Sequence, residues 1–194
     1  MLEELLVKNR KWVEKQLNND SQYFKTLADG QSPEIMLVGC CDSRFPFEVM
    51  TGSIPGEIFV HRNIANQVNP ADEDVVSAIE FAVKVLNVKH IVVCGHYECG
   101  GVKASLEPVD LEHVNSHIDS IIELYKFTNE ELSLLNYQER YMKMVELNVE
   151  NQCESLSKLD FVLDAVKSTG FPHIHGWVFD ISSGLIENLE INQY

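Results

Sequence analysis

Two short cysteine-containing segments hold the residue types that are best suited to chemistry. They are Gly39-Cys40-Cys41-Asp42-Ser43-Arg44 and Cys94-Gly95-His96-Tyr97-Glu98-Cys99-Gly100-Gly101. Two thiolates and one imidazole suit zinc, which binds sulfur at about 2.3 Å and nitrogen at about 2.0 Å. Cys40, His96 and Cys99 are therefore candidate zinc ligands, and the spacing of His96 and Cys99 lets one turn of backbone present both.

The number of candidate ligands favours a catalytic site. Structural zinc is usually closed by four protein ligands, whereas catalytic zinc keeps one position for water or substrate. Asp42 is the fourth candidate, either as a direct ligand or as an acceptor of a hydrogen bond from a zinc-bound water. Arg44, whose planar guanidinium matches a carboxylate, could hold Asp42 away from the metal. Such a pair would act as a pH-sensitive gate.

The elements around the two segments explain how they could meet. Each segment follows a short apolar run, at 35–40 and at 90–94, that is typical of a strand buried on both faces. A helical pattern at 72–86, with acidic residues at its start, lies between them. This order predicts an α/β fold, a mostly parallel sheet of four or five strands flanked by helices. Sites in such sheets lie beyond the carboxyl ends of the strands.

The remaining segments complete a single predicted domain over residues 1–194. Apolar positions at 2–17 predict an amphipathic helix within an N-terminal arm over residues 1–30. Residues 57–60 predict a further strand, and 111–167 are mostly helical in pattern. The alternating tail around Ser182-Ser183-Gly184 predicts a hairpin.

The amino-acid composition limits which partners the protein could bind and in which cell compartment it could function. Fifteen Lys and Arg against thirty Asp and Glu give a formal charge of −15, which disfavours binding to nucleic acid or to anionic membranes. The chain has no apolar run of about 18 residues and no signal-peptide pattern at its start. Five cysteines, an odd number, fit a reducing compartment, so we expect a cytoplasmic protein.

The residues alone leave other interpretations open. A cysteine beside an apolar strand is often only a small buried residue, which is the favoured view of Cys41, Cys94 and Cys153. A redox role for Cys40-Cys41 or Cys94/Cys99 is disfavoured because neither pair has the C-x-x-C spacing. Another alternative is a non-enzymatic zinc site that is permanently closed by Asp42 as the fourth ligand. The presence of Arg44 disfavours it, because a purely structural site needs no arginine to hold Asp42 away from the metal.

The two segments and their surroundings resemble the β-class carbonic anhydrases. The resemblance extends over nearly the whole chain, through Pro55-Gly56-Glu57-x-Phe59-Val60-x-Arg62-Asn63-x-Ala65-Asn66, Ala78-Ile79-Glu80-Phe81-Ala82-Val83 and His175-Gly176-Trp177-Val178-Phe179-Asp180. Within that family the chain is most similar to the bacterial branch that can close its own site.

The resemblance implies an activity and a set of roles. Cys40, His96 and Cys99 would bind one Zn²⁺ per chain, and Asp42 and Arg44 would form the catalytic dyad beside it. A zinc-bound hydroxide would convert carbon dioxide reversibly to bicarbonate and a proton. Backbone N–H groups around Gly100 and Gly101 would stabilise the developing negative oxygens. The family also implies a homodimer, or a tetramer of dimers, with the N-terminal helix lying over a neighbour.

Departures from the family pattern indicate an unusually apolar pocket. Leu37 and Phe179 replace a tryptophan and a tyrosine that help to hold a non-catalytic bicarbonate in the self-closing branch, although Arg62 is retained. We therefore doubt that bicarbonate inhibits this protein. The expected pocket lining beside the glycines is Phe45, Ile54, Phe59 and Phe81, part of it from a partner chain. Such a pocket keeps one alternative open, hydrolysis of carbon disulfide or carbonyl sulfide at the same zinc.

Overall fold

The computed structural model describes residues 1–191, in two compact units, Met1–Ser32 and the chain from Pro33 onward. In the first unit, helix α1 (Leu2–Asn19) is followed by the short helix α2 (Tyr23–Ala28). The two helices contact each other through Trp12, whose ring packs edge-on against Phe24 at a centroid distance of 5.5 Å. No residue of α1 is buried, and its apolar side chains Leu2, Leu5 and Leu6 are more than half exposed.

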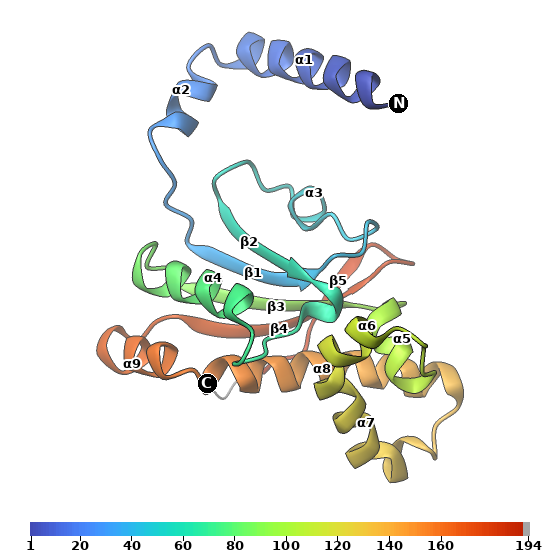
Figure 1. The fold of residues 1–194 in the computed structure, drawn as a ribbon. Helices are drawn as coiled ribbons and strands as arrows, with labels where there is room; N and C mark the ends of the chain where they lie inside the picture. The colour runs from blue at the N-terminus through green and yellow to red at the C-terminus, as the bar shows by residue number, and fades with distance from the viewer. Residues whose placement is uncertain (192–194) are drawn as a thin grey trace. The chain divides into compact units, whose positions relative to one another are not determined.

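The second unit is built on one five-stranded sheet in the order β2-β1-β3-β4-β5 (Figure 1). Four strands are parallel, and their bounds are β1 Ile35–Cys40, β2 Ile58–Asn63, β3 His90–His96 and β4 His173–Asp180. The last strand, β5 (Leu185–Asn188), pairs antiparallel with β4 through the turn at 181–184. The predicted mostly parallel sheet and the terminal hairpin are confirmed.

Helices cover the two faces of this sheet unequally. One face packs against most of the helices (Figure 1), namely α4 Glu73–Lys84, α5 Gly100–Leu106, α7 Asp119–Leu132, α8 Tyr137–Ser157 and α9 Asp160–Thr169. The short α6 (Glu112–His117) joins α5 to α7 on this side. The other face carries a smaller apolar cluster around Phe45 and Phe47, the latter at the start of α3 (Phe47–Thr51). Within residues 1–191, no helix combines the length and the apolar character needed to cross a membrane.

Successive side chains of each strand point to opposite faces of the sheet, so each parallel strand contributes to both apolar clusters. Met36 and Val38 of β1 face the large helical layer, and Leu37 between them faces the smaller cluster. Cys40 has the same parity as Met36, so its side chain reaches the helical side at the end of β1. A short 3₁₀ turn, η1 (Ile64–Asn66), follows β2 directly and lies beside the end of β1.

Candidate metal centre

The ends of β1 and β3 bring the three predicted ligands together. The strands pair in parallel, with Gly39 opposite Cys94, so Cys40 and His96 leave neighbouring strands at the same edge. Cys99 follows three residues after His96 and is the N-cap of α5. The ligand atoms of Cys40, His96 and Cys99 all lie within 4.8 Å of one another, and all three side chains are buried.

The two sulfur atoms have the spacing of thiolates on one tetrahedral ion. Cys40 Sγ and Cys99 Sγ are 3.9 Å apart. Two sulfurs, each about 2.3 Å from a tetrahedral zinc, would lie about 3.8 Å apart. The pair therefore needs almost no movement to bind zinc, and it is too far apart to be a disulfide bond.

His96 presents a bare nitrogen to the same point. The ring is fully buried, and Nδ1 lies 2.8 Å from the carbonyl oxygen of Tyr97. Because a carbonyl only accepts, Nδ1 carries the proton and Nε2 is left with its lone pair. Nε2 has no hydrogen-bond partner. A buried nitrogen without a partner is costly unless a metal occupies it, so the donor set fits zinc.

In the absence of a metal, the pKa values of the two cysteine ligands shift in opposite directions. The contact with Cys99 lowers the pKa of Cys40 against the opposing effect of burial, with smaller contributions from His96 and from the N–H groups of Asp42 and Ala65. The same contact, together with burial, raises the pKa of Cys99. Burial and mutual repulsion thus oppose two thiolates at this place, and a bound cation would be needed to ionise both cysteines.

Asp42 stands beside this group and is held by Arg44. The guanidinium donates from Nε to Asp42 Oδ1 at 3.0 Å and from Nη2 to Oδ2 at 2.7 Å. These bonds are the main reason that the pKa of Asp42 is lowered to about 2. Asp42 Oδ2 is 3.8 Å from His96 Nε2, so the carboxylate borders the ligand atoms. Arg44 Nη2 also donates to the Glu98 carbonyl at 3.1 Å, which links the two segments.

Arg62 stabilises the backbone of the first segment, a role that the sequence analysis did not anticipate. Its Nε donates to the Cys40 carbonyl at 2.7 Å and its Nη2 to the Asp42 carbonyl at 2.8 Å. The sequence contains one signal for this contact, because Arg62 follows a predicted strand next to β1 and would reach the same edge of the sheet.

The six residues expected to line a substrate pocket are not brought together within one chain. Phe45 is fully buried beside the ligands, its ring 5.9 Å from that of His96. Phe59 and Phe81 stack on each other at 5.8 Å on the side of α4, and Phe81 is 43% exposed. Ile54 lies in a surface groove of the α3–β2 connection.

The two glycines at the start of α5 differ in their surroundings. A Cβ on Gly101 would lie 2.7 Å from Ile64 and 2.9 Å from Ala65, whereas one on Gly100 would meet nothing within 4 Å. The N–H groups of Gly101 and Val102 offset part of the rise in the pKa of Cys99 that Cys40 and burial cause. The role predicted for the N–H groups around Gly100 and Gly101, stabilising substrate oxygens, stays a prediction.

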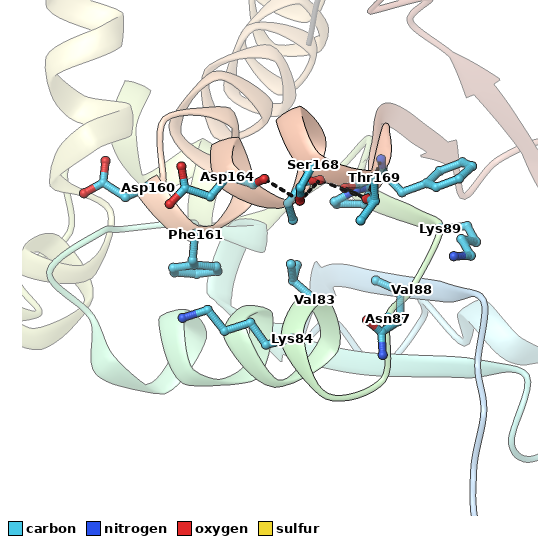
Figure 2. A pocket seen from close by; sticks show the side chains of 13 residues that line it. Val83, Lys84, Asn87, Val88, Lys89, Asp160, Phe161, Asp164, Ser168 and Thr169 are labelled. Atoms are coloured by element: carbon cyan, nitrogen blue, oxygen red, sulfur yellow. Dashed lines mark hydrogen bonds between the residues drawn. The ribbon is translucent and has the colours of Figure 1, made fainter.

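A cavity unrelated to the ligands lies at the other end of the strands. It has a volume of about 580 Å³, between the end of α4, the loop before β3 and helix α9 (Figure 2). Lys84 lies over the ring of Phe161 at 5.5 Å, and Lys89 lies over Phe171 at 4.7 Å. None of the metal-centre residues lines this cavity.

Comparison with known proteins agrees with this geometry. The carbonic anhydrase family profile matches residues 35–186. A carbonic anhydrase of Emericella nidulans is 45% identical over 185 residues, covering 95% of this chain and 81% of the relative. One from Pseudomonas aeruginosa is 35% identical over 175 residues, covering 88% and 79%.

Solved structures show the same fold over the full chain. The β-carbonic anhydrase CafA of Aspergillus fumigatus has a TM-score of 0.95 at 37% identity and covers 100% of this chain and 92% of its own. A tetrameric β-carbonic anhydrase of Sordaria macrospora has a TM-score of 0.95 at 35% identity, covering 100% and 98%.

The fold and the Cys-His-Cys centre at the carboxyl edge of its sheet define a metal-dependent α/β enzyme. The chain belongs to the carbonic anhydrase family, in its β class. Its reaction is the reversible hydration of carbon dioxide, and its metal is zinc.

Proposed function

We propose that Cys40, His96 and Cys99 hold the zinc ion and that Asp42 and Arg44 are the catalytic dyad beside it. The observation that carries this assignment is the convergence of three buried ligand atoms within 4.8 Å next to a carboxylate tied back by a guanidinium. Three protein ligands leave one coordination position free, as catalytic zinc requires. Zinc bound there would lower the pKa of water enough to supply a nucleophile near neutral pH.

The residues around the ligands have distinct tasks. Asp42 is an anion at neutral pH, so its carboxylate can only accept, and it orients the attacking water by taking a hydrogen bond from it. Arg44 fixes the plane of that carboxylate with two parallel hydrogen bonds. Phe45 covers one side of the His96 ring and excludes water from it.

We further propose that the centre is of the self-closing type found in the bacterial branch but is not controlled by a second bicarbonate. In that type Asp42 would leave Arg44 and take the fourth position. Leu37 and Phe179 are buried in the small apolar cluster and offer no side-chain donor to an anion. Arg62 uses Nε and Nη2 on backbone carbonyls. These observations support a dyad that switches without bicarbonate.

We propose that the N-terminal arm packs on a second copy, in a dimer or a tetramer of dimers. A tetrameric relative of the same fold supports assembly. Helix α1 exposes an apolar stripe formed by Leu2, Leu5, Leu6, Trp12 and Leu17. The cytoplasm is the proposed location, because all five cysteines are free thiols.

Stopped-flow hydration of carbon dioxide, combined with zinc analysis, tests the function. We expect one zinc per chain and activity that disappears with the metal. Release of sulfide from carbon disulfide without any hydration of carbon dioxide would contradict the assignment, as would full activity in a sample that contains no metal.

A further inference from the structure

A buried amide network packs against η1, beside the end of β1. It contains Gln67, Asn148 and Gln152, which are each no more than 2% exposed, and it accepts a hydrogen bond from Ser120, an exposed residue. Asn148 and Gln152 are on α8, Ser120 is on α7, and Gln67 follows η1. Polar side chains are expensive in a core unless they are fully bonded, so their placement calls for a physical reason.

The network converges on one backbone carbonyl. The Ala65 carbonyl oxygen accepts from Gln67 Nε2 at 2.7 Å and from Asn148 Nδ2 at 3.1 Å. Gln67 Nε2 also donates to Asn148 Oδ1 at 2.9 Å, so the two amides orient each other. Ser120 Oγ donates to Gln67 Oε1 at 2.6 Å, which fixes the flip state of that amide.

Ala65 has a backbone conformation that needs such support. Its φ is +59° and its ψ is +32°, in the left-handed region that alanine rarely adopts, and its side chain is fully buried. Strain of this kind persists only where surrounding contacts determine the conformation. The two amide donors on the Ala65 carbonyl are contacts of that sort.

The strained residue lies between the two segments that carry the cysteine ligands. The η1 turn that contains it contacts β1, which ends at Cys40, and α5, which begins directly after Cys99. Its methyl group leaves no room for a Cβ on Gly101, two residues after Cys99. A shift of Ala65 would therefore alter the packing at both segments and with it the spacing of the two sulfurs.

We propose that Asn148 and Gln67 are positioning residues for the metal: they hold the Ala65 carbonyl, and through Ala65 they set the spacing of the two cysteine ligands. The inference rests on the proposed zinc ligands. Residues that orient ligands in this indirect way typically change metal affinity by about 10–100-fold when they are removed.

The test compares zinc release from the holoenzyme and its variants. Asn148→Leu and Gln67→Met each keep the volume but remove one donor to Ala65. We expect each to release zinc to a chromogenic chelator about 10–100-fold faster than the wild type. The double variant should release it faster still, because it leaves the carbonyl with neither amide. In the cobalt-substituted enzymes, the thiolate-to-cobalt absorption should change in the same order.

A matched control separates positioning from stability. Leu156→Ala removes a fully buried side chain from the same helix, α8, without removing a hydrogen bond of the network. It should lower the urea midpoint at least as much as Asn148→Leu does, yet release zinc within about twofold of the wild-type rate. If Asn148→Leu or Gln67→Met does not fold, the zinc release of the other variant tests the proposal. Ser120→Ala is a third, milder variant, because it removes only the hydrogen bond that Ser120 donates to Gln67.

Three results would overturn the proposal. Network variants that release zinc at the wild-type rate would show that the amides only satisfy a buried turn. Equally fast release from Leu156→Ala would show that zinc loss follows stability. A wild-type chain that binds no zinc would overturn the proposed function together with this inference, whereas the first two results leave that function intact.

Discussion

Arg44 holds the Asp42 carboxylate by both oxygens, 3.0 Å from Nε and 2.7 Å from Nη2, while Asp42 Oδ2 remains 3.8 Å from His96 Nε2. The carboxylate is therefore close enough to act at the metal and is restrained from binding it. Arg44 is 53% exposed and Asp42 17% exposed, so water reaches this side of the centre. The gate proposed for Asp42 and Arg44 starts from this paired geometry.

Replacing Asp42 by Asn should abolish most turnover. The amide keeps the size but presents a donor where the carboxylate accepted, so it no longer orients the attacking water. We expect kcat/KM for hydration to fall about 100-fold or more, with one zinc per chain retained. Asp164→Asn, on the rim of the distant cavity in Figure 2, is the control and should have wild-type activity. An active Asp42→Asn enzyme would remove Asp42 from the mechanism.

Zinc binding should stabilise the folded protein in addition to making the enzyme active. The bare His96 Nε2 and the shared charge of Cys40 and Cys99 are satisfied only when a cation binds. Free zinc at about 1,000 times its Kd adds about 4 kcal/mol. That corresponds to a rise in Tm of about 8–16 °C for a chain of this size. Calorimetry of the chelated protein before and after zinc addition measures the rise, which should be absent in His96→Ala.

The parts of the site that follow from strand ends could be predicted from the sequence. Cys40 and His96 come at the ends of two apolar runs, and parallel pairing forces such ends together at one edge. Cys99 follows from its spacing to His96. Asp42 and Arg44 are two residues apart in the same short segment, so their contact needs no long-range information.

Other features of the site could not be predicted, because they depend on which face of the sheet a side chain occupies or on contacts between residues far apart in the sequence. Phe59 lies opposite Met36 and faces α4, whereas Phe45 lies in the cluster on the other face, so these two phenylalanines do not meet within one chain. Gln67 and Asn148 are 81 residues apart, and nothing in their local sequence pairs them. The left-handed conformation of Ala65 contradicts the local preference of alanine.

The histidine pair at the start of β3 and β4 should make the fold sensitive to acid. His90 Nδ1 and His175 Nε2 are 3.0 Å apart, and the pKa of His175 is lowered by burial, then by His90 and His173. Below about pH 6.5, the usual histidine pKa, the unfolded chain therefore binds a proton that folded His175 resists. The free energy of unfolding is highest above that pH and decreases as the pH falls.

Urea unfolding at pH 7.5 and pH 5.5 measures this effect. The midpoint of the wild type should fall between the two pH values by more than that of His175→Gln, which lacks the titrating ring. His113→Gln removes an exposed histidine and should behave as the wild type does. Identical pH dependence in all three proteins would mean that His175 does not contribute.

Charge on the apolar stripe of α1 should weaken assembly. Leu6 is 61% exposed in the single chain and lies on the stripe proposed to meet a partner. Loss of one buried leucine costs about 1.5–3 kcal/mol, so Leu6→Glu should weaken self-association by about 10-fold or more. Sedimentation velocity over a concentration series measures the change. Asn18→Glu adds the same charge to α1 outside the stripe and should leave assembly unchanged.

The adjacent glycines of α5 provide a comparison in which one methyl group is moved by a single residue. Gly101→Ala places a Cβ 2.7 Å from Ile64 and 2.9 Å from Ala65, so η1 must shift, and we expect a loss of about 1–3 kcal/mol in the free energy of unfolding. Gly100→Ala meets no atom within 4 Å and replaces a weak helix former, so it should be neutral or stabilising by up to about 1 kcal/mol. Because η1 also contacts β1, which ends at Cys40, only Gly101→Ala should release zinc faster than the wild type. Equal effects of the two substitutions on urea midpoints and zinc release would show that η1 moves at little energetic cost and does not constrain the ligands.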